Sequence, residues 1–169
     1  GIQKAFGDKV IFKDLSLDVR QGETLTIIGG SGVGKSVCLK LLTALLRPNA
    51  GTVTAFGESV HDMNEAGLIG LRKRISMLFQ GAALFDSMSV EDNIKYPLRE
   101  HRWGTEAEMD KRVTEVLELV DMRGIQTTRP SELSGGMKKR VGLARAIAIQ
   151  PEVILYDEPT TGLDPINVR

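Results

Sequence analysis

The sequence lacks several features that mark large classes of protein. Cys38 is the only cysteine, so no disulfide can form within the chain, and a reducing compartment fits. No apolar run approaches the roughly 20 residues of a membrane span, so we expect any work at a membrane to be done through a partner. The 22 basic residues equal the 22 acidic ones, which argues against a domain that mainly binds nucleic acid. With 18 glycines and 41% apolar residues, the composition favours an α/β protein with many tight turns.

The stretch "TLTIIGGSGVGKSVCLKLLTALL" contains the pattern Gly-x-x-x-x-Gly-Lys-Ser over residues 29–36. Such a pattern needs a buried strand before it and a helix after it. Residues 25–28 are a continuous β-rich run, and residues 37–46 have apolar side chains at helical spacing. The sequence therefore predicts a strand, a phosphate-binding loop and a helix, in that order. We expect Cys38 to pack on the apolar side of that helix.

The residue types of this loop suit a nucleotide. Its glycines let successive N–H groups face phosphates, Lys35 would reach the β- and γ-phosphates, and the Ser36 hydroxyl would ligate Mg²⁺. The alternative is a glycine-rich turn with a solvated lysine. The predicted nucleotide-binding residues of the loop are Gly29, Gly30, Ser31, Gly32, Val33, Gly34, Lys35, Ser36 and Val37.

Two carboxylates follow a second apolar run in "PEVILYDEPT". Residues 153–156 are typical of a central parallel strand covered on both faces, and open α/β sheets place their ligands at the ends of such strands. Asp157 would then hold the Mg²⁺ shell, and Glu158 would orient and polarise an attacking water. The alternative is a pair of exposed acids at a strand end.

The stretch "LSGGMKKRVGLARAIAIQPEVILYDEPTTGLDP" resembles the signature helix, Walker B strand and D-loop of ABC-type ATPases. The resemblance extends over essentially the whole chain, with the motifs in the family's order. It implies ATP and Mg²⁺ as cofactors, with Phe6 stacking on adenine and Gln80 sensing Mg²⁺ and the γ-phosphate. It also implies that Asp164 of the D-loop is a nucleotide-binding residue, and that Lys35, Gln80 and Glu158 are the catalytic residues.

Ser134, Gly135 and Gly136 precede a predicted helix and could present backbone N–H groups to an anion. In the family, two copies pair head to tail, and the signature of one closes over the ATP of the other. The resemblance therefore assigns these three residues to the nucleotide of a partner subunit.

Met137 stands where the signature usually has glutamine, and Asp86-Ser87 replace a Pro-His-like pair found in many ABC importers. Both departures resemble the ATPases of MCE-linked lipid importers, the Mla-type systems. That resemblance implies an ATPase homodimer, an integral membrane permease and an MCE-type substrate-binding protein as partners, with no nucleic acid. The location implied is the cytoplasmic face of the inner membrane. One alternative is a soluble ABC ATPase of DNA repair, chromosome structure or translation. The other is a non-catalytic binding module in which ATP only holds two surfaces together and is not hydrolysed.

A mostly helical region follows Gln80. Thr105 and Glu108 form a predicted capping box, and four apolar residues at helical spacing follow, Val113, Val116, Leu117 and Val120. Ser89 predicts a second helix start, with an end before Pro97. The resemblance makes this region the permease contact, with Leu84, Phe85, Met88 and Tyr96 as candidates; burial in the region's own core is the alternative.

The expected fold is α/β, a RecA-like phosphate-loop core with an N-terminal antiparallel β portion and a helical ABC-specific subdomain. We expect the core over residues 1–80 and 141–169 and the helical subdomain over 81–140. The family's switch histidine, which follows the D-loop, has no counterpart here, and the chain reads as truncated at both ends. These 169 residues alone are therefore expected to bind ATP poorly and to hydrolyse hardly any.

Overall fold

A computed structural model describes residues 1–158, and the chain divides into two compact units between Arg72 and Lys73. The division into a core of 1–80 plus 141–169 and a helical subdomain of 81–140 remains a prediction. Within the described residues, no helix combines the length and the apolar character that crossing a bilayer requires.

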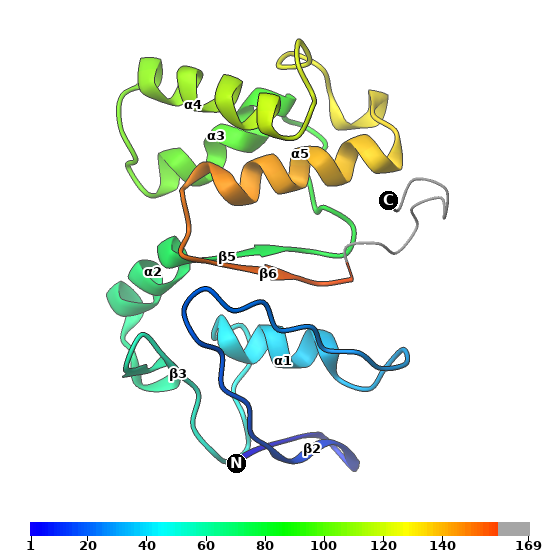
Figure 1. The fold of residues 1–169 in the computed structure, drawn as a ribbon, viewed down its shortest axis with the longest axis vertical. Helices are drawn as coiled ribbons and strands as arrows, with labels where there is room; N and C mark the ends of the chain where they lie inside the picture. The colour runs from blue at the N-terminus through cyan, green and yellow to red at the C-terminus, as the bar shows by residue number, and fades with distance from the viewer. Residues whose placement is uncertain (159–169) are drawn as a thin grey trace. The chain divides into compact units, whose positions relative to one another are not determined.

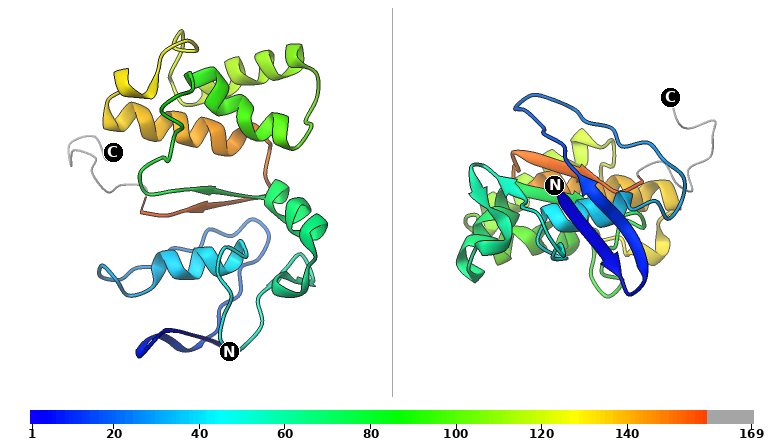
Figure 2. Two further views of the ribbon diagram at one scale, coloured as in Figure 1. Left: turned by 180° about the vertical axis from the view of Figure 1, so that it is seen from behind. Right: turned by 90° about the horizontal axis from the view of Figure 1, so that it is seen from below.

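The first unit begins with an antiparallel hairpin, β1 (Ile2–Phe6) and β2 (Lys9–Leu15), seen in the right panel of Figure 2. The predicted N-terminal antiparallel portion is thereby confirmed. A second, short hairpin joins β3 (Thr54–Ala55) to β4 (Glu58–Ser59), with Phe56 and Gly57 both at positive φ, as tight hairpin turns require. A 3₁₀ helix, Val60–Asp62, follows, and α2 (Glu65–Arg74) leads into the second unit.

The helix after the phosphate loop is α1 (Lys35–Leu42), which ends four residues earlier than its apolar spacing predicts. The Thr43 hydroxyl donates to the carbonyls of Leu39 and Lys40, and Ala44 has φ 53°, so the backbone leaves the helix there. The N–H groups of Leu45 and Leu46 both turn back to Lys40 O and close the end. Cys38 is buried as expected, and burial raises the pKa of its thiol.

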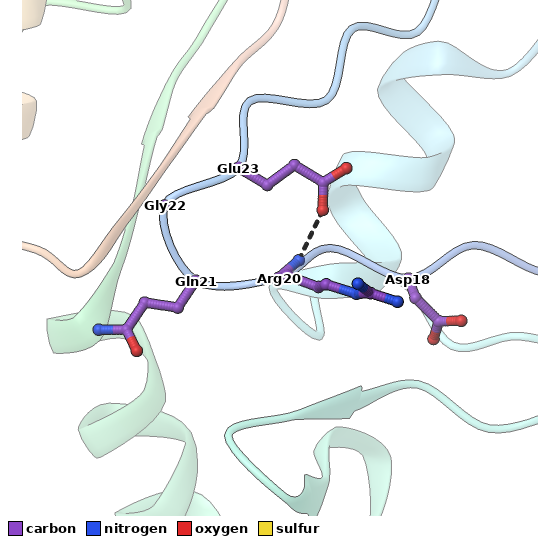
Figure 3. Close-up of a pocket in the computed structure, with 5 residues that line it drawn as sticks. All are labelled: Asp18, Arg20, Gln21, Gly22 and Glu23. Carbon is purple, nitrogen blue, oxygen red and sulfur yellow. Dashed lines mark hydrogen bonds between the residues drawn. The ribbon is translucent and has the colours of Figure 1, made fainter.

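The predicted buried strand at residues 25–28 is wrong. Leu25, Ile27 and Ile28 are 45%, 40% and 91% exposed, and within the described chain residues 16–30 pair with no strand. An apolar run becomes a strand only where a neighbour accepts and donates its backbone hydrogen bonds. The local order here is a turn instead: the Glu23 carboxylate accepts from the Arg20 N–H at 2.9 Å, beside a shallow surface hollow (Figure 3).

The second unit contains a parallel pair, β5 (Ile75–Leu78) and β6 (Val153–Tyr156), in register from Ile75–Val153 to Leu78–Tyr156 (Figure 1). The predicted strand at 153–156 is confirmed. The expectation that it is covered on both faces is wrong, because Val153 and Tyr156 are 36% and 46% exposed. In the described chain β6 pairs with β5 alone, so it lacks the second neighbour of a central strand.

Three helices, α3 (Val90–Glu100), α4 (Glu106–Leu119) and α5 (Gly135–Ala148), pack on one another in the same unit (Figure 1). A 3₁₀ helix, Pro130–Glu132, precedes α5. Both predicted helix starts are confirmed: Ser89 Oγ accepts from the Asp92 N–H, and Thr105 and Glu108 form the reciprocal capping box. The predicted apolar face of α4 is buried. The central members of this core are Val90, Ile94, Leu98, Val113, Val116, Leu117, Val141, Ala144 and Ala148.

Pro97 does not end α3, contrary to the sequence-based expectation; the helix runs through it to Glu100. Proline removes one backbone hydrogen bond from the helix ladder, at a cost of about 3 kcal/mol or more. Ile94 and Leu98 stand on either side of it and are both fully buried. Burial of two large apolar side chains offsets that cost, at roughly 1.5–3 kcal/mol each.

A buried lysine ties α3 to α4. Lys95 is 5% exposed and forms ion pairs with Glu91, Asp110 and Glu106, while the neighbouring Arg99 pairs with Glu106. Burial opposes the charge of Lys95, but its hydrogen bonds to Asp110 and Glu91 outweigh that effect and raise its pKa. The cluster therefore joins the two helices by charge-assisted contacts as well as by their apolar faces.

Candidate functional site

The phosphate loop has the backbone conformation that its glycines predict. Gly32 and Gly34 have φ of 79° and 109°, in the region where side chains are strained. A Cβ at Gly34 would also meet Ile11 Cγ2 at 2.6 Å and the Phe12 ring at 2.9 Å. Only glycine therefore lets this loop lie so close to β2.

Lys35 begins α1 and folds back over the loop. Its Nζ donates to the carbonyl oxygens of Gly29 and Gly30, both at 2.9 Å. No side chain caps α1 at Gly34, and its first turn has no acidic residue. The positive end of the helix is therefore not neutralised from within the helix, and it suits an anion. Ser31 and Val33 lie in the exposed part of the loop, while Ser36 and Val37 lie in the first turn of α1.

Phe6, the proposed adenine contact, stands at the end of β1 with 47% of its surface exposed. Lys4 Nζ lies 4.8 Å from the centre of its ring. An exposed aromatic face of this kind can stack on a planar base.

The structure brings Gln80 and Glu158 together. Gln80 Nε2 donates to Glu158 Oε2 at 3.0 Å. Gln80 follows β5 and Glu158 follows β6, and the carboxyl ends of parallel strands meet at one edge of a sheet. Asp157 is 6% exposed, and its N–H donates to Leu78 O at 3.0 Å, which holds the residue against the end of β5.

The oxygen donors predicted for a metal fit Mg²⁺. The Ser36 hydroxyl, the Gln80 amide oxygen and the Asp157 carboxylate are hard oxygen ligands, which Mg²⁺ takes together with waters and phosphate oxygens. Among residues 1–158 no cluster of three or more His, Cys, Asp or Glu side chains could hold a metal by itself.

The signature residues begin α5. Ser134 is its N-cap, with Oγ accepting from the Met137 N–H at 3.2 Å, and Gly135 and Gly136 form the first turn. That turn has no acidic residue, and a Cβ at Gly135 would meet nothing within 4 Å. Met137 is partly buried and packs against the helical core. Asp164 lies outside the described residues.

The four apolar candidates for a partner surface divide into two kinds. Leu84 packs against the helical core, and Met88 is half-buried. Phe85 and Tyr96 are 41% and 39% exposed, with ring centroids 4.8 Å apart.

Sequence reasoning missed two residues that hold the segment after Gln80. Asn93 is fully buried; its Oδ1 accepts from Phe85 N at 2.8 Å, and its Nδ2 donates to Phe85 O at 3.1 Å. Arg145 binds two carbonyls of the same segment. A polar Asn93 on the face shared by Val90 and Ile94 was the available signal, whereas Arg145 has none in the sequence.

Comparison with known proteins agrees with this geometry. Residues 12–161 match the ABC transporter family profile. The chain is 45% identical over 99% of its length to a probable ribonucleotide transport ATP-binding protein, mkl, of Mycobacterium leprae, of which it covers 48%. It is 44% identical over 96% of its length to the intermembrane phospholipid transport system ATP-binding protein MlaF of Escherichia coli, of which it covers 60%.

Among solved structures, the ATP-binding cassette MJ0796, a dimer in a post-hydrolysis state with ADP and Pi, superposes with a TM-score of 0.87. It is 30% identical, with coverage of 98% of this chain and 74% of that one. The chain spans about half the length of the first curated relatives it matches. The motifs, the α/β fold and the extent of the family match lead to one conclusion: the chain belongs to the ABC transporter family.

Proposed function

We propose that this chain is the ATP-binding and ATP-hydrolysing part of an ABC transporter. The observation that carries the proposal is the phosphate loop, in which Gly34 at φ 109° leads into Lys35 and into a start of α1 that has no side-chain cap and no acidic residue. A helix N-terminus with such a loop is an anion site by its backbone dipoles alone. Phe6 supplies an exposed aromatic face for the base.

The chemistry divides among a few side chains. Lys35 neutralises charge on the β- and γ-phosphates, and Glu158 orients a water and accepts its proton as the bond to phosphorus forms. Mg²⁺, when bound, neutralises the developing charge on the phosphate oxygens. Ser36, Asp157 and Gln80 would hold it.

Dimer formation follows from the signature. Ser134, Gly135 and Gly136 point a second helix start toward solvent, and we assign it to the ATP of a partner subunit. The dimeric cassette with ADP and Pi supports this arrangement. The D-loop residue Asp164 is assigned to the same interface by resemblance.

The proposed cargo is phospholipid, moved by an integral membrane permease with an MCE-type substrate-binding protein. The name of the Escherichia coli relative and the Met137 and Asp86-Ser87 departures support this cargo. The mycobacterial relative carries a ribonucleotide transport name, so relatives of similar identity differ in the cargo they are named for. The proposed location is peripheral, on the cytoplasmic face of the inner membrane. A soluble ABC ATPase is the alternative.

The test uses the full-length protein with Glu158→Gln, expressed in its own host and extracted in mild detergent with ATP. Mass spectrometry then identifies what co-purifies, with Lys35→Ala as the control that removes the ATP dependence. A polytopic membrane protein with an MCE-type subunit and bound phospholipid is the expected result. Recovery of only soluble partners or nucleic acid would support the alternative and contradict the transporter proposal.

A further inference from the structure

The segment directly after Gln80 has an unusual backbone. Ala82 and Ala83 have φ of 61° and 47°, a left-handed conformation that L-residues other than glycine, asparagine and aspartate rarely adopt. Two such residues in succession persist only where the surroundings hold them. The surroundings here come from α3 and α5 of the same unit.

Arg145 of α5 makes the most direct contact. Its Nη1 donates to Ala83 O at 2.9 Å and its Nη2 donates to Ala82 O at 2.6 Å. Its guanidinium carbon lies 5.8 Å from the centre of the Phe85 ring, a cation–π distance. One planar fork therefore fixes the two strained peptides and the aromatic side chain that follows them.

The backbone of α5 also lies close to Ala82. A Cβ at Gly142 would lie 2.9 Å from Ala82 Cβ and 3.0 Å from Leu78 Cδ1. Ala82 is 1% exposed. On the other side, Asn93 pairs with both backbone groups of Phe85. Residues 82–85 are thus held between two helices, beginning two positions after Gln80.

Stability does not explain the arginine. Burial lowers the pKa of Arg145, and among residues 1–158 the side chain forms no ion pair with an acidic residue. A partly buried cation held by neutral carbonyls gains no ion-pair energy, and an apolar side chain of similar volume often serves stability as well. What the guanidinium adds is the fixed geometry of two donors.

We propose that Arg145 is a positioning residue for Gln80, which it keeps in place beside Glu158 by clamping the carbonyls of Ala82 and Ala83. Arg145 also belongs to α5, which starts at Ser134 about 16 Å away along the helix axis. The clamp therefore joins the amide that senses the subunit's own nucleotide to the helix that presents the signature to the partner's nucleotide. The inference rests on the proposed function.

Arg112 provides a matched control. Its guanidinium donates to two carbonyls in the same way, from Nε to Ala148 O and from Nη2 to Ile147 O, both at 2.9 Å, but these carbonyls belong to the end of α5 and not to the segment after Gln80. The experiment measures kcat and KM of the full-length protein with Arg145→Met, Arg145→Lys and Arg112→Met. Each is made in the wild-type background and with Gln80→Asn.

Arg145→Met should lower kcat about tenfold and leave KM within about twofold in the wild-type background, since a misplaced Gln80 affects the reaction more than binding. In the Gln80→Asn background, Arg145→Met should lower kcat by less than about a further twofold. The effects of two substitutions do not add when one residue acts through the other. Arg145→Lys should lie between, and Arg112→Met should change kcat by the same factor in both backgrounds. Equal factors for Arg145→Met in both backgrounds would overturn the proposal.

Hydrogen–deuterium exchange gives a readout that does not depend on activity. Arg145→Met should speed exchange of amides in residues 80–88, whereas Arg112→Met should leave exchange in that segment unchanged. Unchanged exchange at 80–88 in Arg145→Met contradicts the clamp. A different result would contradict the proposed function itself: the wild-type protein would not hydrolyse ATP, or Lys35→Ala would not change its turnover.

Discussion

The amide nitrogen of Gln80 and a carboxylate oxygen of Glu158 lie 3.0 Å apart, although the two residues are 78 positions apart in the sequence. Each residue follows one strand of the parallel pair, and that pairing puts them at one edge. One oxygen of the proposed water-activating carboxylate is thus already engaged in this structure.

Glu158→Gln in the full-length protein should keep ATP affinity and lower turnover about 10²- to 10⁴-fold, the usual contribution of a general base. The variant should also accumulate as an ATP-bound dimer, measured by size-exclusion chromatography with light scattering. Glu152→Gln is the control, since that acid is exposed and bound to Arg74. Unchanged turnover in Glu158→Gln would mean that another group activates the water.

Met137→Gln should change ATP-driven dimerisation by less than about threefold, because surface-facing and partly buried substitutions of similar size are usually mild. Its backbone N–H, which bonds to Ser134 Oγ, is kept by any residue at this position. Analytical ultracentrifugation with ATP in the Glu158→Gln background measures the effect. Loss of the dimer would assign a specific packing role to the Met137 side chain.

Thr105→Ala should destabilise α4 by about 1 kcal/mol, because it removes the hydroxyl that caps the Glu108 N–H. The Thr105 backbone N–H lowers the pKa of the Glu108 carboxylate. The substitution keeps that hydrogen bond but removes the one that the Thr105 hydroxyl donates to the same carboxylate. Native-state hydrogen exchange of α4 amides measures the change. Thr114→Ala, in the same helix but exposed, should change the opening free energy much less; equal changes would count against the capping box.

Acid should weaken the pairing of α3 with α4. The pKa of Glu106 is lowered mainly by its hydrogen bond to Arg99, and that of Asp110 mainly by its hydrogen bond to Lys95. The ordinary pKa values of these carboxyls are 4.5 for Glu106 and 3.8 for Asp110. A carboxyl whose pKa is lower in the folded protein stabilises the fold at pH values above its ordinary pKa. That stabilisation is lost as the pH falls through the pKa of the folded protein. The urea midpoint should therefore drop below pH 4.5.

Lys95→Met should flatten that drop and lower the midpoint at neutral pH, because it leaves the surrounding carboxylates without their buried cation. Lys111→Met is the matched control, since Lys111 Nζ lies 4.0 Å from Glu115 on an exposed face. A parallel pH dependence in wild type and Lys95→Met would show that the cluster does not carry the acid sensitivity.

Sequence reasoning succeeded where the cause is local. The caps at Ser89 and Thr105 and the apolar face of α4 follow from side chains within a turn or two of one another. It failed where a distant partner decides. Residues 25–28 have the composition of a strand but pair with no strand among residues 1–158, and Pro97 stays helical because Ile94 and Leu98 are buried. Arg145 could not be predicted, because its importance lies in two carbonyls more than 60 positions away.

The Ser134 hydroxyl has two roles, one in starting a helix and one in the proposed phosphate site. It accepts the Met137 N–H and so starts α5, and a hydroxyl that accepts in this way still has a proton to donate to an incoming phosphate. The residue that displays the signature is thus also the residue that makes its helix begin. A substitution of Ser134 would therefore remove the cap of α5 and the hydroxyl proposed for the partner's phosphate at the same time.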